Sequence, residues 1–258
     1  MTSAIHPSAL VHSGARLAAD VVVGPYAVIE DEAIIGDGST IGAHAVVKRY
    51  TRMGRRNRVY EHAVIGGDPQ DYKFKECASF VSIGDDNLIR EGVTIHRGSV
   101  AGAETRIGSH CFLMANCHVA HDCTIGDNVV IANGTLLGGV VNIGDQAFIS
   151  GAVTIHQFCR VGRLALLAAS ARINQDCLPF VITDGAPGRA RGLNLVGLKR
   201  AGIPASEIAE LKRAFHVLRT AVGLDIALAE LAASASPSVA ELVQFIRTSK
   251  RGFAHPSN

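Results

Sequence analysis

The chain has 258 residues, of which 48% are hydrophobic and 19% are charged, and its net charge is +2. A charge this close to zero argues against a dedicated nucleic-acid-binding protein. No apolar run is long enough for an integral membrane segment, and the N-terminus has neither the basic start nor the apolar stretch of a signal peptide.

From the first residues onward, an aliphatic residue or a methionine recurs at every sixth position. This repeat runs from Ile5 to Ile173, and only Asp71, Cys77 and Ala101 depart from it. A small residue usually follows four positions later. The spacing fits neither the period of a helix nor that of a strand alone. It is typical of a parallel β-helix, in which short strands wind around a triangular prism and every third hexapeptide stacks on the first.

The repeat predicts two domains, a β-helix over residues 1–186 and an α-helical domain over residues 187–258. Two excursions interrupt the β-helix, near 66–82 and near 98–106, and we interpret both as walls of a binding site. In the second domain, Ile208 and Leu211 begin an apolar helical stripe. A later helix is expected to start at Ser236 and to end near Gly252.

The six cysteines follow the spacing of the fold itself. Five occupy the small position of the repeat and Cys77 occupies the aliphatic position, which predicts buried thiols rather than disulfides or metal ligands. A reducing, cytoplasmic location is the corresponding expectation.

Histidines gather at one corner of the expected prism. Counted by whole coils of three hexapeptides, His118, His121 and His156 fall close together. His96 counts to another face, so its approach to the others requires either a neighbouring subunit or a loop that resets the register. The sequence leaves both possibilities open.

His121 is followed directly by Asp122, a pair that suits a general base held in one tautomer by a carboxylate. The alternative is that Asp122 only fills a polar turn. A metal site is a further alternative, because His118 and His121 have ligand spacing. The chain offers no thiolate outside the packing positions, and this favours a site without a metal.

Five stretches, taken together, resemble the UDP-N-acetylglucosamine 3-O-acyltransferase family, which opens lipid A biosynthesis. These stretches are Gln70–Lys73, Ile89–Gly98, His118–Gly126, Val153–Phe158 and Asn194–Arg200. The resemblance implies a left-handed parallel β-helix, a homotrimer with sites between subunits, and no cofactor. It also implies transfer of a 3-hydroxyacyl chain from acyl carrier protein to the 3-hydroxyl of the nucleotide sugar.

The resemblance further implies roles for individual residues. His121 is expected to act as the general base, Asp122 to orient it, and the Gly139 backbone N–H to stabilise the oxyanion. The residues implied for substrate binding are Gln70, Asp71, Lys73, His96, His118, His156, Gln157, Asn194 and Arg200. The position that gauges acyl length corresponds to Ala169.

The chain departs from the family pattern at three positions. Val140 stands where a further histidine is implied, Val196 where an acidic residue is common, and Ala169 where glycine is common. These changes leave open a paralogue that acts on another nucleotide sugar or acyl donor, or an inactive structural β-helix. A coenzyme A-dependent acetyltransferase and a γ-type carbonic anhydrase are more distant alternatives.

Two basic clusters are candidates for docking the acidic acyl carrier protein. Their members are Lys48, Arg49, Arg52, Arg55, Arg56 and Arg58 in the first, and Lys199, Arg200, Lys212, Arg213 and Arg219 in the second. For the first cluster, a solvated face is the simpler interpretation.

Overall fold

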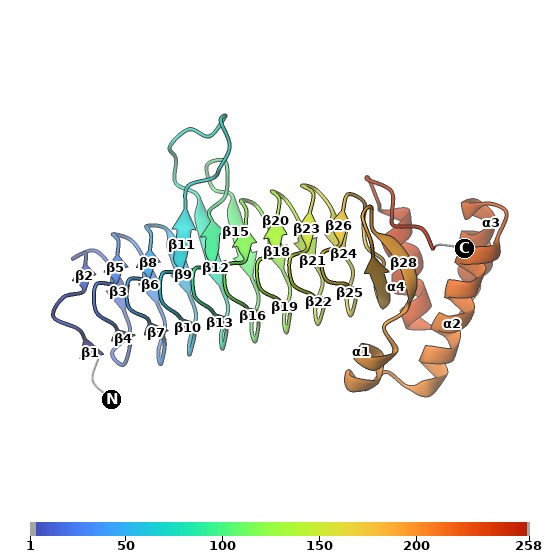
Figure 1. Ribbon diagram of the computed structural model, residues 1–258, viewed down its shortest axis with the longest axis horizontal. Coiled ribbons are helices and arrows are strands. Elements are labelled where there is room, and N and C mark those ends of the chain that lie inside the picture. Colours follow the sequence, from blue (N-terminus) through green and yellow to red (C-terminus); the bar gives the residue numbers. More distant parts are fainter. Residues whose placement is uncertain (1–3, 257–258) are drawn as a thin grey trace.

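The structure is a computed structural model that describes residues 4–256. Its strands wind into a long triangular prism, and a group of helices follows at the C-terminal end (Figure 1). The three faces of the prism are three sheets, and each coil contributes one short strand to each sheet. All strand pairings in the described chain are parallel, except that of the last two strands.

Sheet A contains, in spatial order, β1 (Ala4–Ile5), β4 (Val22–Val23), β7 (Thr40–Ile41), β10 (Arg58–Val59), β13 (Leu88–Ile89), β16 (Phe112–Leu113), β19 (Val130–Ile131), β22 (Phe148–Ile149), β25 (Leu166–Leu167), β27 (Val181–Asp184) and β28 (Arg189–Leu193). Sheet B contains β2 (Leu10–Val11), β5 (Val28–Ile29), β8 (Val46–Val47), β11 (Val64–Gly67), β14 (Thr94–His96), β17 (His118–Val119), β20 (Leu136–Leu137), β23 (Thr154–Ile155) and β26 (Arg172–Ile173). Sheet C contains β3 (Arg16–Leu17), β6 (Ile34–Ile35), β9 (Thr51–Met53), β12 (Phe80–Ile83), β15 (Glu104–Ile107), β18 (Thr124–Ile125), β21 (Asn142–Ile143) and β24 (Arg160–Val161).

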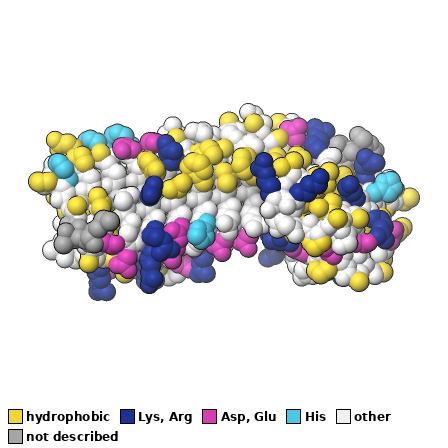
Figure 2. All heavy atoms as spheres, turned by 90° about the horizontal axis from the view of Figure 1, so that it is seen from below, with side chains coloured by type: hydrophobic (Ala, Val, Ile, Leu, Met, Phe, Trp, Pro, Cys, Tyr) yellow, Lys and Arg dark blue, Asp and Glu magenta, His cyan; other side chains and the backbone are white. Residues whose placement is uncertain are grey.

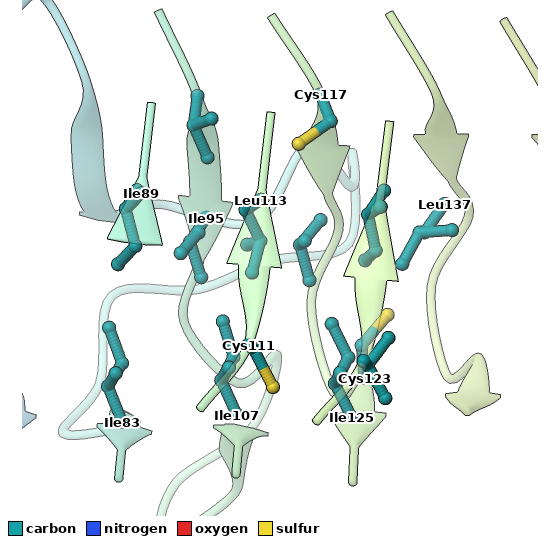
Figure 3. Packing of buried hydrophobic residues seen from close by; sticks show 14 of the residues in the cluster. Ile83, Ile89, Ile95, Ile107, Cys111, Leu113, Cys117, Cys123, Ile125 and Leu137 are labelled. Carbon is teal, nitrogen blue, oxygen red and sulfur yellow. The ribbon is translucent and has the colours of Figure 1, made fainter. Parts of the chain in front are cut away.

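The core of the prism is made by the two inward positions of the hexapeptide repeat. Aliphatic side chains from all three sheets meet along the axis, as Ile95, Ile107 and Leu113 do in Figure 3. Five of the six cysteines are buried among them, and all six are free thiols. Burial raises the pKa of these five thiols to about 11 or 12, as for Cys117. Their role is therefore packing.

Both excursions lengthen their coils by whole hexapeptides. Val64 pairs with Val46 one regular coil before it, but its partner in the next coil is Thr94, which lies two hexapeptides farther along the chain than a regular coil would place it. Leu88 pairs with Phe112, a step that exceeds a regular coil by one hexapeptide. The hexapeptide phase therefore survives both loops, and the strands beyond them stack as before. Both loops project from the same side of the prism in Figure 1.

The C-terminal segment caps the prism. Strand β28 lies beyond residue 186 and pairs antiparallel with β27, so the helices begin only at Leu195. The division at 186/187 stays a prediction. The helices are α1 (Leu195–Arg200), α2 (Ala205–Thr220), α3 (Leu224–Leu231) and α4 (Pro237–Arg247).

The expected start of α4 is present, because the Ser236 side chain accepts a hydrogen bond from the Val239 N–H and proline follows at the first helical position. The expected end near Gly252 is wrong, because α4 stops at Arg247. The chain then turns back to the prism, where the Asp176 N–H donates to the Gly252 carbonyl at 2.9 Å. Within residues 4–256, no helix is both long enough and apolar enough to cross a membrane.

Candidate active site

A groove of about 850 Å³ runs along the outer face of sheet B, over strands β14 to β26. Its lining begins at the first excursion loop and ends at the C-terminal tail. The lining residues are Gln70, His96, His118, Ala120, His121, Leu136, Leu137, Gly138, Gly139, Thr154, Ile155, His156, Gln157, Arg172, Ile173, Asn174 and Arg251. Six of the expected site residues, together with Gly139, are therefore in one groove.

At the middle of the groove, His121 and Asp122 form a hydrogen-bonded pair. Nδ1 of His121 lies 2.7 Å from Oδ2 of Asp122, and the two side chains are only 17% and 19% exposed. The Asp122 carboxylate also accepts from the Ser99 backbone N–H, at 3.1 and 3.2 Å. Because the carboxylate accepts the Nδ1 proton, the lone pair of Nε2 is left to receive a proton. This arrangement fits a general base.

The His121 imidazole lies directly against the backbone of Gly139. A Cβ atom on Gly139 would lie 2.6 Å from both Cε1 and Nε2 of His121, closer than any side chain tolerates. Position 139 therefore requires glycine for contact with the ring. The Gly139 N–H makes no hydrogen bond to the described residues, so it is available to an oxygen beside His121.

The N-terminal end of the groove holds two further histidines. Nδ1 of His118 lies 2.8 Å from Oγ1 of Thr94, and the His118 and His96 rings are 5.0 Å apart. Burial, together with the charge of His96, lowers the pKa of His118 to about 4. His118 is therefore a neutral hydrogen-bonding group at physiological pH. His96 donates from Nδ1 to the Asp68 carbonyl at 2.5 Å, provided that Nδ1 carries the proton.

The second excursion brings His96 beside His118. Thr94 pairs with His118, a step that is one hexapeptide longer than a regular coil, and this shift moves His96 onto the same sheet. Of the two possibilities left open by the sequence, a loop that resets the register is therefore the one realised within the chain.

Arg97, which the sequence analysis did not identify, holds the first excursion loop at its base. Its side chain is only 2% exposed, and Nη2 donates to Asp68 at 3.0 Å and to Glu76 at 2.8 and 2.9 Å. Nη1 donates to the Cys77 carbonyl and to Oγ of Ser79. The sequence could have identified Arg97, because it lies inside the Ile89–Gly98 stretch next to His96.

Other expected residues lie farther from His121. Asp71 and Lys73 are exposed on the first excursion loop, outside the groove lining, and the Asp71 carboxylate accepts from the Lys73 N–H at 2.9 Å. His156 and Gln157 are exposed at the corner of the groove, two coils beyond His121. Within a single chain, the hydrogen bond between Asp71 and the Lys73 N–H therefore stabilises the first excursion loop itself.

Asn194 and Arg200 line a separate hollow of about 380 Å³ between sheet A and α1. Asn194 is 5% exposed and caps α1, because its Oδ1 accepts from the Gly197 N–H at 3.0 Å while its Nδ2 donates to the Leu164 carbonyl at 2.9 Å. Its amide therefore positions the helix that carries Arg200. Within a single chain, this hollow lies at sheet A and His121 lies in the groove at sheet B, so the two are separate.

The comparisons with known proteins agree with this architecture. A family model described as Udp N-acetylglucosamine O-acyltransferase, Domain 2, matches residues 176–254, and one described as bacterial transferase hexapeptide (six repeats) matches residues 14–49 and 104–139. The chain is 49% identical over 252 residues to an acyl-[acyl-carrier-protein]–UDP-N-acetylglucosamine O-acyltransferase from Halorhodospira halophila, which covers 96% of this chain and 98% of the relative. This chain belongs to that acyltransferase family.

Two further matches extend over nearly the whole length. The Stutzerimonas stutzeri relative of the same name is 42% identical over 254 residues, covering 97% of this chain and 98% of its own. A UDP-N-acetylglucosamine acyltransferase structure from Bacteroides fragilis superposes with a TM-score of 0.94 at 38% identity, covering 96% of this chain and 99% of that one. The predicted fold class, a left-handed parallel β-helix followed by helices, is thus confirmed.

Two departures from the family pattern have a clear place in the structure. Val140 sits at the corner next to Gly139 with φ +62°, a conformation that β-branched residues rarely adopt, and its N–H donates to the His121 carbonyl at 3.0 Å. Ala169 is exposed at the corner between β25 and β26, outside the groove lining.

Most of the basic residues between 48 and 58 are matched by carboxylates on neighbouring coils. The pairs are Lys48–Glu30 at 2.8 Å, Arg49–Glu32 at 2.9 Å, Arg55–Asp37 at 4.0 Å and Arg56–Asp86 at 2.6 Å. In the second cluster only Arg213 has an ion pair with a described residue. The second cluster therefore has the larger share of uncompensated charge.

Proposed function

We propose that this protein transfers a 3-hydroxyacyl chain from acyl carrier protein to the 3-hydroxyl of UDP-N-acetylglucosamine, the first step of lipid A biosynthesis. The observation that carries the proposal is the contact between the His121–Asp122 pair and Gly139. It puts a proton acceptor and an unpaired N–H donor side by side, as acyl transfer requires. Membership of the acyltransferase family supplies the substrates.

The reaction follows from this arrangement. Nε2 of His121 takes the proton of the sugar hydroxyl as its oxygen attacks the thioester carbonyl. The Gly139 N–H stabilises the negative charge on the tetrahedral intermediate. When the intermediate collapses, the carbon–sulfur bond breaks and the thiolate of the carrier takes the proton from the imidazolium. The ester and the free thiol are the products, and no acyl-enzyme is formed.

The polar end of the groove suits the sugar. His118 is neutral and half-buried, and with His96 it offers hydrogen bonds to hydroxyl and amide groups. Gln70 belongs to this wall, whereas His156 and Gln157 border the groove at the corner two coils beyond His121. We assign Asp71 and Lys73, on the exposed loop, to a substrate held between two subunits.

We propose a homotrimer in which sheet A of one subunit faces sheet B of the next. The outward positions of sheet A are largely apolar, and those of sheet B are apolar in its first four strands and again at Leu136, whereas those of sheet C are largely polar or charged. Outward residues include Leu88, Phe112, Val130, Phe148 and Leu166 on sheet A, Leu10, Val28, Val46, Val64 and Leu136 on sheet B, and Arg16, Arg52, Arg106, Asn142 and Arg160 on sheet C.

The view from below, the side where the sheet A labels lie in Figure 1, has a band of hydrophobic side chains along the prism (Figure 2). A cyclic assembly of unlike faces covers both apolar surfaces in every subunit. It also brings the Arg200 hollow of one subunit towards the His121 groove of the next, which gives Asn194 and Arg200 a nucleotide-binding role.

We further propose that acyl carrier protein docks at the second basic cluster, whose charge is largely uncompensated. A cytoplasmic location is part of the same proposal. Six free thiols favour a reducing compartment.

The test is an acylation assay with UDP-N-acetylglucosamine and a series of 3-hydroxyacyl carrier proteins, with products identified by mass. The expected product is the sugar nucleotide carrying one ester-linked acyl chain. If a folded trimer gives no product with any donor, the proposed substrate is wrong. The same assay with other UDP-sugars would then identify the acceptor that Val140 and Val196 permit.

A further inference from the structure

The floor of the groove contains a row of three residues that the roles assigned above do not use. Leu136, Thr154 and Arg172 occupy matching outward positions on β20, β23 and β26, and each is paired with the next in the strand register. Strands in a sheet are about 4.8 Å apart, so Arg172 lies roughly 10 Å along the axis from Leu136. Leu136 and Arg172 are both exposed to the groove.

The groove differs in polarity on the two sides of His121. Towards the N-terminus the outward row continues with His118 and Thr94, which are hydrogen-bonded to each other. Towards the C-terminus it begins with Leu136, whose side chain is 46% exposed and apolar. A polar sugar therefore fits the first side, and an acyl chain that leaves the Gly139 N–H fits the second.

At its C-terminal end, the row formed by Leu136 and Thr154 meets positive charge. β26 is the last strand of sheet B, so the floor ends there. The Arg172 side chain makes no hydrogen bond or ion pair with the described residues. The nearby Arg251 donates from Nε and Nη2 to the Asn174 carbonyl at 3.3 and 3.2 Å, which adds a second guanidinium to the same end.

We propose that Arg172 sets the upper limit on the length of the acyl chain. This inference rests on the proposed acyl transfer and adds its specificity-determining residue. A chain that grows along Leu136 and Thr154 reaches the Arg172 guanidinium after two coils. Any further methylene has to displace the side chain or strip water from its charge, and both are unfavourable.

The experiment measures donor preference in competition. Two 3-hydroxyacyl carrier proteins that differ by two carbons, the preferred donor of the wild type and the next longer one, are mixed in one reaction. The ratio of products by mass gives the ratio of kcat/KM values, independent of how much enzyme is folded. In Arg172→Ala, the ratio of longer to shorter product is expected to rise about tenfold, because two more methylenes can be buried. Arg172→Met keeps the bulk of the side chain but removes its charge. It provides a second test of the inference if Arg172→Ala does not fold.

Two controls make the result specific. Arg16→Ala removes an outward arginine from sheet C, far from the groove, and is expected to leave the ratio unchanged. Ala169→Gly tests the corner between β25 and β26. An unchanged ratio in both Arg172 variants would overturn the inference while leaving the acyl transfer intact, and so would a shift in Ala169→Gly alone. No transfer by the wild type with any donor would overturn the proposed function, and this inference with it.

Discussion

The His121 imidazole is held by the carboxylate of Asp122, the residue that follows it in the chain, at 2.7 Å. Such a local pair is possible because Asp122 turns a prism corner with φ +59°, a conformation that aspartate tolerates better than most residues. The second excursion loop fixes the carboxylate through the Ser99 N–H. The His121 imidazole is thus oriented by Asp122 at the prism corner and, through Asp122, by the second excursion loop.

Gly139→Ala is expected to lower kcat by at least a hundredfold. The added methyl group would lie 2.6 Å from the His121 ring and would push the imidazole away from the reacting oxygen. The measurement is kcat for acyl transfer, with circular dichroism to check the fold. Gly192→Ala is the matched control, because a Cβ at that position meets no atom within 4 Å. Equal losses in the two variants would contradict the predicted contact.

The stability of the protein is expected to fall between pH 6.5 and pH 4 through His118. The folded-state pKa of His118 is lowered to about 4 from 6.5, so the unfolded state binds more protons in this window. Stability is therefore complete above pH 6.5 and declines as the pH falls. His118→Gln should remove about 1–2 kcal/mol of this loss, since the ring is still partly solvated.

The measurement for His118 is urea unfolding at pH 7 and pH 4.5 with the protein concentration fixed. His62→Gln, at an exposed corner, is the control and should behave as the wild type does. If wild type and His118→Gln lose the same unfolding free energy between the two pH values, the lowered pKa is wrong.

Arg97→Met is expected to raise the KM for the nucleotide sugar about tenfold and to change kcat less. The side chain ties the first excursion loop to the prism through Asp68 and Glu76, and this loop carries Gln70. Loss of these charged hydrogen bonds should also lower the unfolding free energy by about 2–3 kcal/mol. The control is Arg90→Met, whose pair with Glu91 is on the surface and should cost less than about 1 kcal/mol. An unchanged KM would show that the loop does not need this anchor.

Charge reversal in the second basic cluster is expected to weaken binding of the carrier protein. Lys212 and Arg219 are two helical turns apart on α2 and so share a helix face, and neither has an ion pair with a described residue. Lys212→Glu with Arg219→Glu should raise the KM for the acyl carrier about tenfold at low salt and less at high salt. Arg55→Glu, beside Asp37, should have little effect. The opposite pattern would move the docking site to residues 48–58.

The sequence was most informative where one rule governs many residues. The six-residue repeat predicted the prism, because each aliphatic side chain must face the same narrow core. Counting by whole coils also predicted the gathering of His118, His121 and His156 in one groove. The same count continued from Leu136 leads to Arg172, but the count alone does not show which outward residues line the groove.

Other features depended on loop lengths and on side-chain contacts, which the six-residue repeat does not encode. The position of His96 required the register shift of one hexapeptide, which only the pairing of Thr94 with His118 reveals. The anchor role of Arg97 depends on the path of an irregular loop. The end of α4 was misjudged because a basic turn before glycine also occurs where the chain leaves the helix to pair with Asp176.

The central claim is that His121 removes the proton of the sugar hydroxyl in the sheet B groove. The most direct measurement is kcat for acyl transfer by His121→Asn beside the wild type, with KM for both substrates and the product verified by mass. Loss of a general base predicts a fall in kcat of about 10²–10⁴, with KM values within a few-fold of the wild type. A kcat within a few-fold of the wild type would contradict the claim and move the base to another residue of the groove.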